Sequence, residues 1–331
     1  MNASVHQPHR PNRPSLPKIG APMQPLDTLL IYEKPDAYFF PCYSDRVFAP
    51  FGVPQPSLRY LAYKALYLLR LPFCSLFWGK WKDYVKGAKQ IIIFDYGYQR
   101  GMEKYIRRIN PHCRVFLFFW NKVNKYNKNH LRFTDADAIY STDPDDCKKY
   151  GLHYNHIFYP QEYHIPYAPS PGQNKLFFLG ADKGRAPYIA SLKQALEEGG
   201  IICDIRILSP VRDSAYRRCF QEILVGKGLP YNEYLGQIKS CNILLDINQK
   251  GQSALTMRVM EALYLSKKLI TNNRRILTYD FYCPENILIL PEKGIPSPEE
   301  LHNFLNTPFR PYPAEILYNY SYGHWLDNFL S

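Results

Sequence analysis

The sequence lacks an apolar run long enough to cross a bilayer. Its longest apolar stretch, residues 65–78, is interrupted by Arg70 and Pro72 and falls short of the ~20 residues that a membrane-spanning helix needs. Residues 1–26 contain three basic residues and no apolar segment typical of a secretory signal. We therefore expect a cytoplasmic protein, with residues 1–26 as a disordered tail.

Clustered cysteines are also absent. The eight cysteines are dispersed and form no Cys-x-x-Cys pair, which argues against a zinc site and against a disulfide framework. Asp135 and Asp137 match an Asp-x-Asp metal motif by letter, but they lead into a short strand and we interpret them as capping or solvated residues. We expect no metal and no bound cofactor.

The length and the charge of the chain indicate the number of domains and the kinds of binding partner. The 331 residues, 46% of them hydrophobic, suggest two domains of ordinary size. The net charge is +12, and it is uneven: residues 1–168 hold 23 basic against 13 acidic residues, whereas residues 169–331 hold 18 against 16. A basic first half suits nucleic acid, anionic lipid or a phosphorylated substrate, and charge alone does not choose among them.

Short apolar runs alternate with segments of helical periodicity. We predict strands at 28–32, 90–95, 114–120, 138–140, 175–179, 201–208, 242–247, 268–271 and 287–290. We predict helices at 101–110, 147–150, 187–198, 232–240 and 255–265. Buried strands alternating with helices predict parallel sheets, so the fold class is α/β, with two Rossmann-like doubly wound domains facing a cleft.

A Pro-rich stretch at 165–172 has no periodicity and precedes a new strand, which places the domain boundary there. We expect a first Rossmann-like domain at 27–168, a second at 169–315, and a C-terminal segment at 316–331.

Two loops that follow strands are candidate ligand sites, because ligands of such folds bind beyond the carboxyl ends of the strands. The first contains Gly180, Lys183, Gly184 and Arg185 directly before a helix. Glycines let the backbone approach phosphate, a helix N-terminus offers free N–H groups, and arginine binds two oxygens at once. The loop matches neither the dinucleotide fingerprint nor the P-loop, and an ordinary turn with a solvated arginine is the alternative.

The second loop contains Gly251, Gln252 and Ser253 and leads into a predicted helix that carries Arg258 and Glu261. Ser253 is a suitable N-cap. Glu261 lies eight residues further on, about 12 Å along a helix, which would suit a diphosphate at the cap and a ribose beyond it. The alternative is a surface salt bridge on an amphipathic helix.

Several segments together resemble bacterial GT-B glycosyltransferases of lipopolysaccharide, capsule and exopolysaccharide synthesis. The donor half of those proteins is similar to residues 231–235, 240–246, 251–258, 261–263 and 267–272, and the acceptor half to 94–95, 105–111 and 120–121. The resemblance spans roughly residues 27–330 and rests on the order of the motifs.

The resemblance implies transfer of a sugar from a nucleotide-diphosphate donor, which is a co-substrate bound mainly by the second domain. It implies that Glu261 holds the ribose and that Arg185, helped by Lys183, neutralises the diphosphate leaving group as a catalytic residue without a metal. It also implies phosphate contacts by Gly251, Gln252 and Ser253 and, less directly, Arg258, and a last helix that returns to the first domain. Ser253 stands where many retaining members have a first Glu, so the stereochemistry stays open.

An acceptor site is expected in the first domain. Asp95 ends a predicted strand, where a carboxylate can act as a general base toward an acceptor hydroxyl; a solvated or capping Asp is the alternative. Residues 57–82 interleave basic residues with leucines and aromatics, with a break expected at Pro72. This stretch suits peripheral contact with an anionic membrane that presents a lipid-linked acceptor, whereas a core helix of the first domain is the alternative.

The preferred function is thus a glycosyltransferase that acts on a glycan or lipid-linked acceptor. Two alternatives remain. The charge and the aromatic content suit a single-stranded nucleic-acid-binding protein, but we find no nucleic-acid module and expect no nucleic-acid partner. The missing first Glu leaves open a catalytically inactive partner subunit with the same fold.

Overall fold

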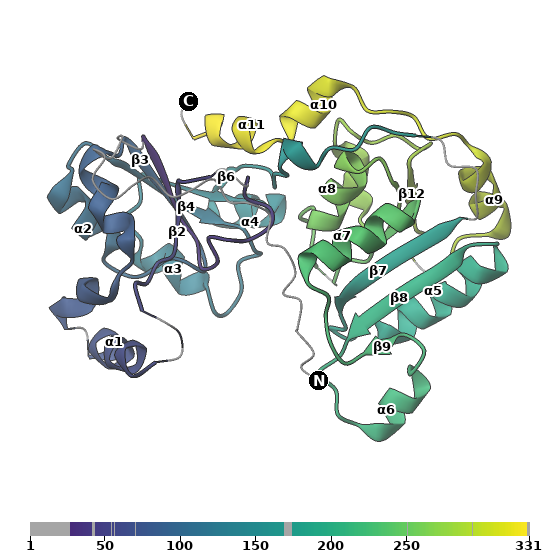
Figure 1. The fold of residues 1–331 in the computed structure, drawn as a ribbon, viewed down its shortest axis with the longest axis horizontal. Coiled ribbons are helices and arrows are strands. Elements are labelled where there is room, and N and C mark those ends of the chain that lie inside the picture. The colour runs from purple at the N-terminus through teal and green to yellow at the C-terminus, as the bar shows by residue number, and fades with distance from the viewer. Residues whose placement is uncertain are drawn as a thin grey trace, which may run out of the picture. The chain divides into compact units, whose positions relative to one another are not determined.

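The computed structural model describes residues 27–329 except 42–43, 54, 56, 70, 169–173, 250 and 293. The tail at 1–26 and part of the Pro-rich stretch at 165–172 therefore lie outside the described residues. The chain divides into two compact units (Figure 1). The first unit is Met1–Phe118 with Lys125–Ala138, and the second unit is Phe119–Asn124 with Ile139–Ser331.

The first sheet has six strands in the order β2-β1-β3-β4-β5-β6. Their bounds are Val47–Phe48 (β2), Thr28–Ile31 (β1), Gln90–Phe94 (β3), Arg114–Phe119 (β4), Ala138–Ser141 (β5) and His153–Tyr154 (β6). The helices of this part of the chain are Leu58–Leu68 (α1), Met102–Ile109 (α2), Lys128–Phe133 (α3) and Pro144–Tyr150 (α4). Short 3-10 helices occupy Pro72–Phe77 (η1), Lys80–Gly87 (η2) and Gln161–Tyr163 (η3).

The second sheet has the order β12-β11-β10-β7-β8-β9. Its strands are Ile287–Ile289 (β12), Lys268–Thr271 (β11), Ile243–Asp246 (β10), Lys175–Ala181 (β7), Ile202–Leu208 (β8) and Leu224–Val225 (β9). Its helices are Ala186–Glu198 (α5), Ser214–Cys219 (α6), Tyr231–Ser240 (α7), Met257–Tyr264 (α8), Pro298–Asn306 (α9), Ala314–Asn319 (α10) and Tyr322–Asp327 (α11), with a 3-10 helix at Arg274–Thr278 (η4). Two parallel six-stranded sheets confirm the predicted α/β class with two Rossmann-like halves.

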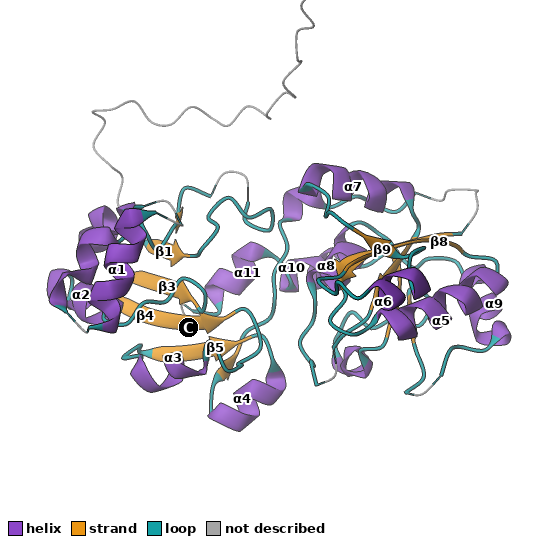
Figure 2. Ribbon diagram, turned by 90° about the horizontal axis from the view of Figure 1, so that it is seen from below, coloured by secondary structure: helices purple, strands orange, loops and turns teal. Residues whose placement is uncertain are grey.

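Alternation along β7 shows how this sheet is packed. Leu176 and Phe178 face a core that includes residues of α5 and α9, whereas the ring of Phe177, on the opposite face, lies 5.7 Å from that of Tyr234 on α7. Figure 2 shows the same layers, with α5 and α9 on one side of the sheet and α7 on the other. A strand covered on both faces must be apolar throughout, which explains why Lys175–Ala181 shows no polar alternation.

Both sheets reverse their strand order at one point. In the second sheet β7 pairs with β8 on one side and with β10 on the other. In the first sheet β1 pairs with β2 on one side and with β3 on the other. Connections that leave such a pair in opposite directions open a crevice at the carboxyl ends of the two strands, where ligands of doubly wound folds bind. Residues that follow β7 and β10, and β1 and β3, are therefore the ones to examine.

The end of the chain packs against residues of the second unit that lie in β5 of the first sheet or follow that sheet. The Trp325 ring lies 4.6 Å from that of Phe158, and the Asn155 amide donates to the Trp325 carbonyl at 3.1 Å. The ring of Phe329 lies 4.6 Å from that of Tyr140 in β5. Ordinary aromatic packing therefore fixes α11 in the second unit.

Among the described helices, none combines the length and the apolar character that crossing a bilayer requires.

Candidate functional site

Arg185 connects the two strands at the reversal point of the second sheet. It is the residue before α5, and its terminal guanidinium nitrogens donate to the carbonyls of Ala181, at the end of β7, and Ile247, just after β10. Its Nε donates to the Asp182 carbonyl at 3.2 Å. A guanidinium has five N–H groups, so one remains on each terminal nitrogen. The sequence-predicted phosphate ligand thus lies where the topology opens a crevice.

Two glycines of this loop have distinct structural roles. A Cβ added to Gly180 would lie 3.0 Å from the Phe178 ring and 3.4 Å from an Arg185 guanidinium nitrogen. Lys183 and Gly184 both have left-handed backbone, with φ of 48° and 78°, which is costly for the lysine and not for the glycine. Gly180 therefore makes room for Arg185, and Gly184 closes the turn.

The start of α5 offers fewer free N–H groups than the sequence suggested. The buried Asp182 carboxylate accepts from the Ala186 amide at 3.1 Å, and Pro187 has no N–H to offer. Burial raises the pKa of Asp182, but hydrogen bonds from Ser209 and Tyr216 outweigh it and the net shift is downward. The Asp182 carboxylate therefore takes one of the N–H groups that the start of α5 would otherwise offer to an anion.

Arg258 contacts the ends of the same two strands, β7 and β10. Its guanidinium donates to the Leu179 carbonyl at 2.7 Å and lies 3.4 Å from the carboxylate of Asp246, the fully buried last residue of β10. Thr256 and Thr271 also donate to Asp246, at 2.8 and 3.1 Å. The buried carboxylate therefore fixes the arginine and gains the three donors that compensate its burial.

Two guanidinium groups converge on one phenylalanine. The Arg258 and Arg185 guanidinium carbons lie 4.6 and 5.7 Å from the Phe178 ring centroid. Burial and the charge of Arg258 lower the pKa of Arg185. Burial lowers that of Arg258, but nearby Tyr234 and Asp246 raise it and the net shift is upward. Asp246 interacts with both cations, Asp182 also interacts with Arg185, and Glu261 with Arg258. Carboxylates therefore hold both guanidinium groups in place, and the planar donors of each are suited to binding an anion.

Glu261 is more deeply buried than the sequence suggested. It lies on α8, is 1% exposed, and accepts from the Tyr234 hydroxyl at 2.6 Å. Burial raises its pKa to about 7, against the hydrogen bond from Tyr234 and the charge of Arg258, which lower it. Its Oε1 and the Nε of Arg258 are buried atoms without a hydrogen-bond partner among the described residues. Each of these two buried atoms can therefore form one more hydrogen bond, and both belong to the group of side chains around Arg258.

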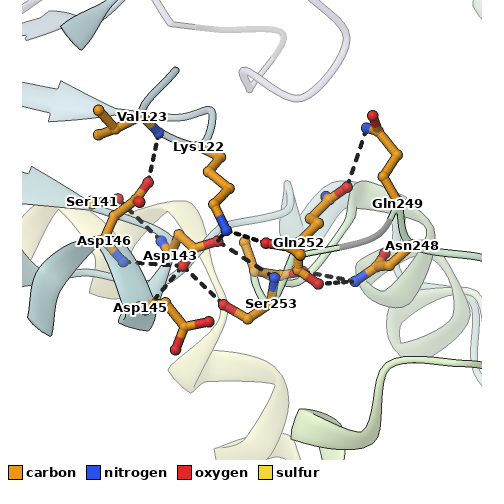
Figure 3. Close-up of polar contacts among 12 residues, drawn as sticks. Lys122, Val123, Ser141, Asp143, Asp145, Asp146, Asn248, Gln249, Gln252 and Ser253 are labelled. Carbon is orange, nitrogen blue, oxygen red and sulfur yellow. Dashed lines mark hydrogen bonds and ion pairs between the residues drawn. The ribbon is translucent and has the colours of Figure 1, made fainter. Parts of the chain in front are cut away.

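The second glycine loop contacts the start of α4 within the second unit (Figure 3). Ser253 donates through its hydroxyl to the Asp143 carboxylate at 2.8 Å, and Lys122 donates to the Gly251 carbonyl and lies 3.9 Å from the same carboxylate. Gln252 is held through its carbonyl by the Asn248 amide at 3.4 Å. The three residues predicted to contact phosphate therefore have protein partners.

The prediction that Ser253 caps the following helix is wrong. Helix α8 begins at Met257, its N-cap is Thr256, and no side chain caps it. The Thr256 hydroxyl donates to Asp246 instead. At α4 a side chain does cap the helix, because the Asp143 carboxylate accepts from the amides of Asp145 and Asp146 at 2.9 and 3.2 Å. In both places a buried carboxylate attracts the nearby donors, and this outweighs the capping preference of a serine.

Asp95, the candidate general base, follows β3 at the reversal point of the first sheet. It is 1% exposed, and its carboxylate accepts from the Asn127 amide at 3.1 Å. Gly97, two residues on, passes so close to β1 that an added Cβ would lie 2.7 Å from the Ile31 carbonyl oxygen. The position at the end of β3 suits an acceptor site. The carboxylate is buried, however, and its catalytic role stays a prediction.

Asp135 and Asp137 have structural partners. Arg107 on α2 contacts the two carboxylates at 3.1 and 2.8 Å, and Asp137 also accepts from the Val115 amide at 2.6 Å. Across the described residues, no group of three or more His, Cys, Asp and Glu side chains has the proximity that a metal ion needs. Both carboxylates therefore have protein partners, and their side chains are 67% and 42% exposed to solvent.

Sequence analysis missed three members of the arginine cluster: Phe178, Tyr234 and Asp246. The sequence did contain a signal for Asp246. A carboxylate at the carboxyl end of a buried apolar strand is itself buried and needs hydrogen-bond donors. Phe178 and Tyr234 had none, because one looks like an ordinary strand residue and the other like an ordinary helix residue.

The comparisons with known proteins agree with this architecture. No family model matches the chain, and no curated protein matches its sequence. Among solved structures it is similar to the crystal structure of AviGT4, a glycosyltransferase involved in avilamycin A biosynthesis, with a TM-score of 0.50 and 12% identity over 92% of this chain and 96% of that one. The chain therefore shares with that protein a fold of two Rossmann-like α/β halves.

Proposed function

We propose that the protein is a glycosyltransferase that transfers a sugar from a nucleoside-diphosphate donor to a glycan or lipid-linked acceptor of a cell-surface polysaccharide. The carrying observation is the pair of guanidinium groups, Arg185 and Arg258, that converges on Phe178 at the reversal point of the second sheet. The glycosyltransferase fold supports sugar transfer in general. The polysaccharide acceptor rests on the sequence resemblance.

The proposed chemistry is stabilisation of the leaving group. When the sugar departs, the diphosphate gains negative charge, and preorganised cationic donors lower the energy of that state. Among the described residues, each terminal nitrogen of Arg185 has one N–H without a partner, so the side chain suits bidentate binding of a phosphate, with Lys183 nearby. Because two guanidinium groups supply the charge, the proposed reaction needs no metal, and activity in excess EDTA should equal activity in added Mg²⁺.

The proposed position of the nucleoside is beside Glu261. Its Oε1 has no hydrogen-bond partner among the described residues, and a ribose hydroxyl is a donor that fits a carboxylate. Glu261 is 1% exposed, so this contact requires the Tyr234 and Arg258 side chains to shift as the nucleotide binds.

The first experiment measures thermal stabilisation by UDP, GDP, dTDP and CMP, with AMP and single-stranded DNA as comparison ligands. A ligand that binds only the folded state raises its stability, by about 2.7 kcal/mol at a hundredfold excess over the dissociation constant. We expect one nucleoside diphosphate to stabilise the protein and Arg185→Ala to weaken that effect about 100-fold in dissociation constant. Stabilisation by DNA alone, unchanged in the variant, would overturn the proposal in favour of a nucleic-acid-binding protein.

A matched control lies on the neighbouring strand. Arg206 on β8 is 5.7 Å from the Phe177 ring, just as Arg185 is 5.7 Å from that of Phe178, but it faces the other side of the sheet and pairs with Asp204. Arg206→Ala removes the same charge from the same unit. It should leave nucleotide binding unchanged, so an equal loss in both variants would show a general charge effect and not a site.

A further inference from the structure

Helix α1 presents two faces of opposite character. Tyr60, Tyr63 and Tyr67 recur at helical spacing, and Tyr63 is buried, with its ring 4.7 Å from that of Phe51 and 6.1 Å from that of Phe77. Its hydroxyl donates to the Gln99 side chain. This aromatic face attaches the helix to the first unit, and Figure 1 shows α1 at the edge of that unit, outside the sheet.

The other face is apolar and exposed. At about 100° per residue, Leu58, Leu61, Leu68 and the C-cap Leu69 fall on one side of the helix, opposite the tyrosines. Leu58, Leu68 and Leu69 are 85, 79 and 69% exposed. The following turn continues the surface with a second exposed set: Leu71, Phe73 and Leu76. We call these seven side chains the leucine patch. An exposed apolar group of this size marks an interaction surface.

The charged residues within 57–82 all have one sign. Residues 57–82 contain five basic residues, Arg59, Lys64, Arg70, Lys80 and Lys82, and no acidic residue. Arg59 and Lys64 are exposed, and at helical spacing they flank the leucines on either side. An apolar face bordered by basic residues is the pattern of a helix that lies in the surface of an anionic membrane.

We propose that the leucine patch docks the protein on an anionic lipid bilayer, with the leucines in the acyl boundary and the flanking basic residues at the headgroups. The charge disfavours a second copy as the occupant, because dimerisation through this face would bring two sets of basic residues together. It equally disfavours residues 1–26, which contain three basic and no acidic residues. The proposal stands on α1 and η1 and does not depend on nucleotide binding.

The test is co-sedimentation of the full chain with vesicles of phosphatidylcholine alone or with about one third phosphatidylglycerol. We expect binding to the anionic vesicles that decreases with salt, and about a tenfold or greater loss in Leu61→Glu. The matched control is Leu277→Glu, because Leu277 in η4 is 45% and Leu61 is 56% exposed. Absence of vesicle binding, or equal loss in both variants, would overturn the proposal.

A second pair of variants separates location from net charge. Arg59→Glu with Lys64→Glu reverses two charges beside the leucine patch, whereas Arg217→Glu with Arg218→Glu reverses two exposed charges on α6. Only the first pair should weaken vesicle binding. If the purified wild-type protein dimerises and Leu61→Glu makes it monomeric without changing vesicle binding, the patch belongs to a second copy and the proposal is wrong. Nucleotide stabilisation measured in Leu61→Glu should be unchanged, which keeps this test separate from that of the donor site.

Discussion

Single side chains at the end of the second sheet combine burial with charge, and Glu261 is the clearest case. Its carboxyl group is almost fully buried beside Arg258 and accepts from Tyr234. Burial opposes ionisation, whereas the neighbours favour it, and burial prevails. Because its pKa is about 7, this carboxyl group changes its charge as the pH passes through neutrality.

The pH dependence of stability should show this group. The folded state raises the pKa of Glu261 from 4.5 to about 7, so the folded state holds the proton more tightly than the unfolded state. The resulting stabilisation is complete below pH 4.5 and is lost as the pH rises through about 7. We expect this carboxyl to contribute a loss of roughly 3 kcal/mol over that interval, and Glu261→Gln to remove it.

Thermal unfolding at pH 4.5, 6 and 8 measures this effect, with Glu233→Gln as an exposed control on α7. A melting temperature that decreases equally with pH in wild-type protein and in Glu261→Gln would contradict it.

Gly180 gives a second prediction for a single residue. Because an added methyl group would press on the Phe178 ring and the Arg185 guanidinium, Gly180→Ala should displace the arginine. We expect a destabilisation of about 1–2 kcal/mol and a larger proportional loss of nucleoside-diphosphate binding, about tenfold. Gly228→Ala is the control, since its Cβ would meet only the end of the Leu208 side chain at 3.4 Å. Calorimetric titration of both variants distinguishes a local displacement of Arg185 from general loss of stability.

Among the secondary-structure elements, helix starts were the least predictable feature. The sequence predicted a helix at 255–265, but α8 begins at Met257, and its residues from Val259 to Tyr264 are all buried. Ser253 has the chemistry of a cap, yet its hydroxyl donates to Asp143, 110 residues earlier in the chain. A local preference of about 1 kcal/mol is easily outweighed by a buried carboxylate that needs a donor.

Helix α7 contains an exposed glycine that tertiary structure does not require. A Cβ at Gly236 meets nothing within 4 Å, and the residue lies inside Tyr231–Ser240. Gly236→Ala should therefore raise the free energy of unfolding by about 0.5–1 kcal/mol through the lower entropy of the unfolded chain. Chemical denaturation measures the change. A decrease would mean that this side of α7 contacts something that the described residues do not include.

For the whole molecule, the donor proposal predicts where binding is felt along the chain. Arg185, Arg258 and Glu261 all belong to the second unit, so a bound nucleoside diphosphate should slow amide hydrogen exchange in the segments after β7 and β10 and at the start of α8. Exchange in α1 should not change. Mass-spectrometric exchange with and without the nucleotide checks this pattern, and protection confined to the basic first half of the chain would contradict it.

The net charge of +12 is also a property of the whole molecule, and it affects binding of polyanions. It predicts weak association with any polyanion, which decreases steeply with salt because counterions are released. Binding of single-stranded DNA that disappears with salt and is the same in Arg185→Ala would be this general effect. The measurement is a salt titration of DNA binding beside the nucleotide titration.

The sequence by itself determined the fold class and most strands of the two sheets. Apolar runs such as 28–32, 90–95 and 268–271 coincide with β1, β3 and β11 within a residue, because a strand covered on both faces must be apolar along its whole length. Helical periodicity likewise identified α2, α5 and α7. These patterns depend only on the spacing of apolar residues within a short segment. Short elements such as β2, β6 and β9, with two residues each, depend on a neighbouring strand and had no such pattern.

Only the tertiary structure decided which of those residues meet. Arg185 and Ile247 are 62 residues apart and are joined because β7 and β10 are neighbours at the reversal of strand order. The same adjacency brings Arg258 to Leu179 and leaves Glu261 buried under Tyr234. Strand order is set by the free energy of long-range packing and not by local spacing. The sequence could therefore name the charged residues, but the position of each in the site follows from the fold.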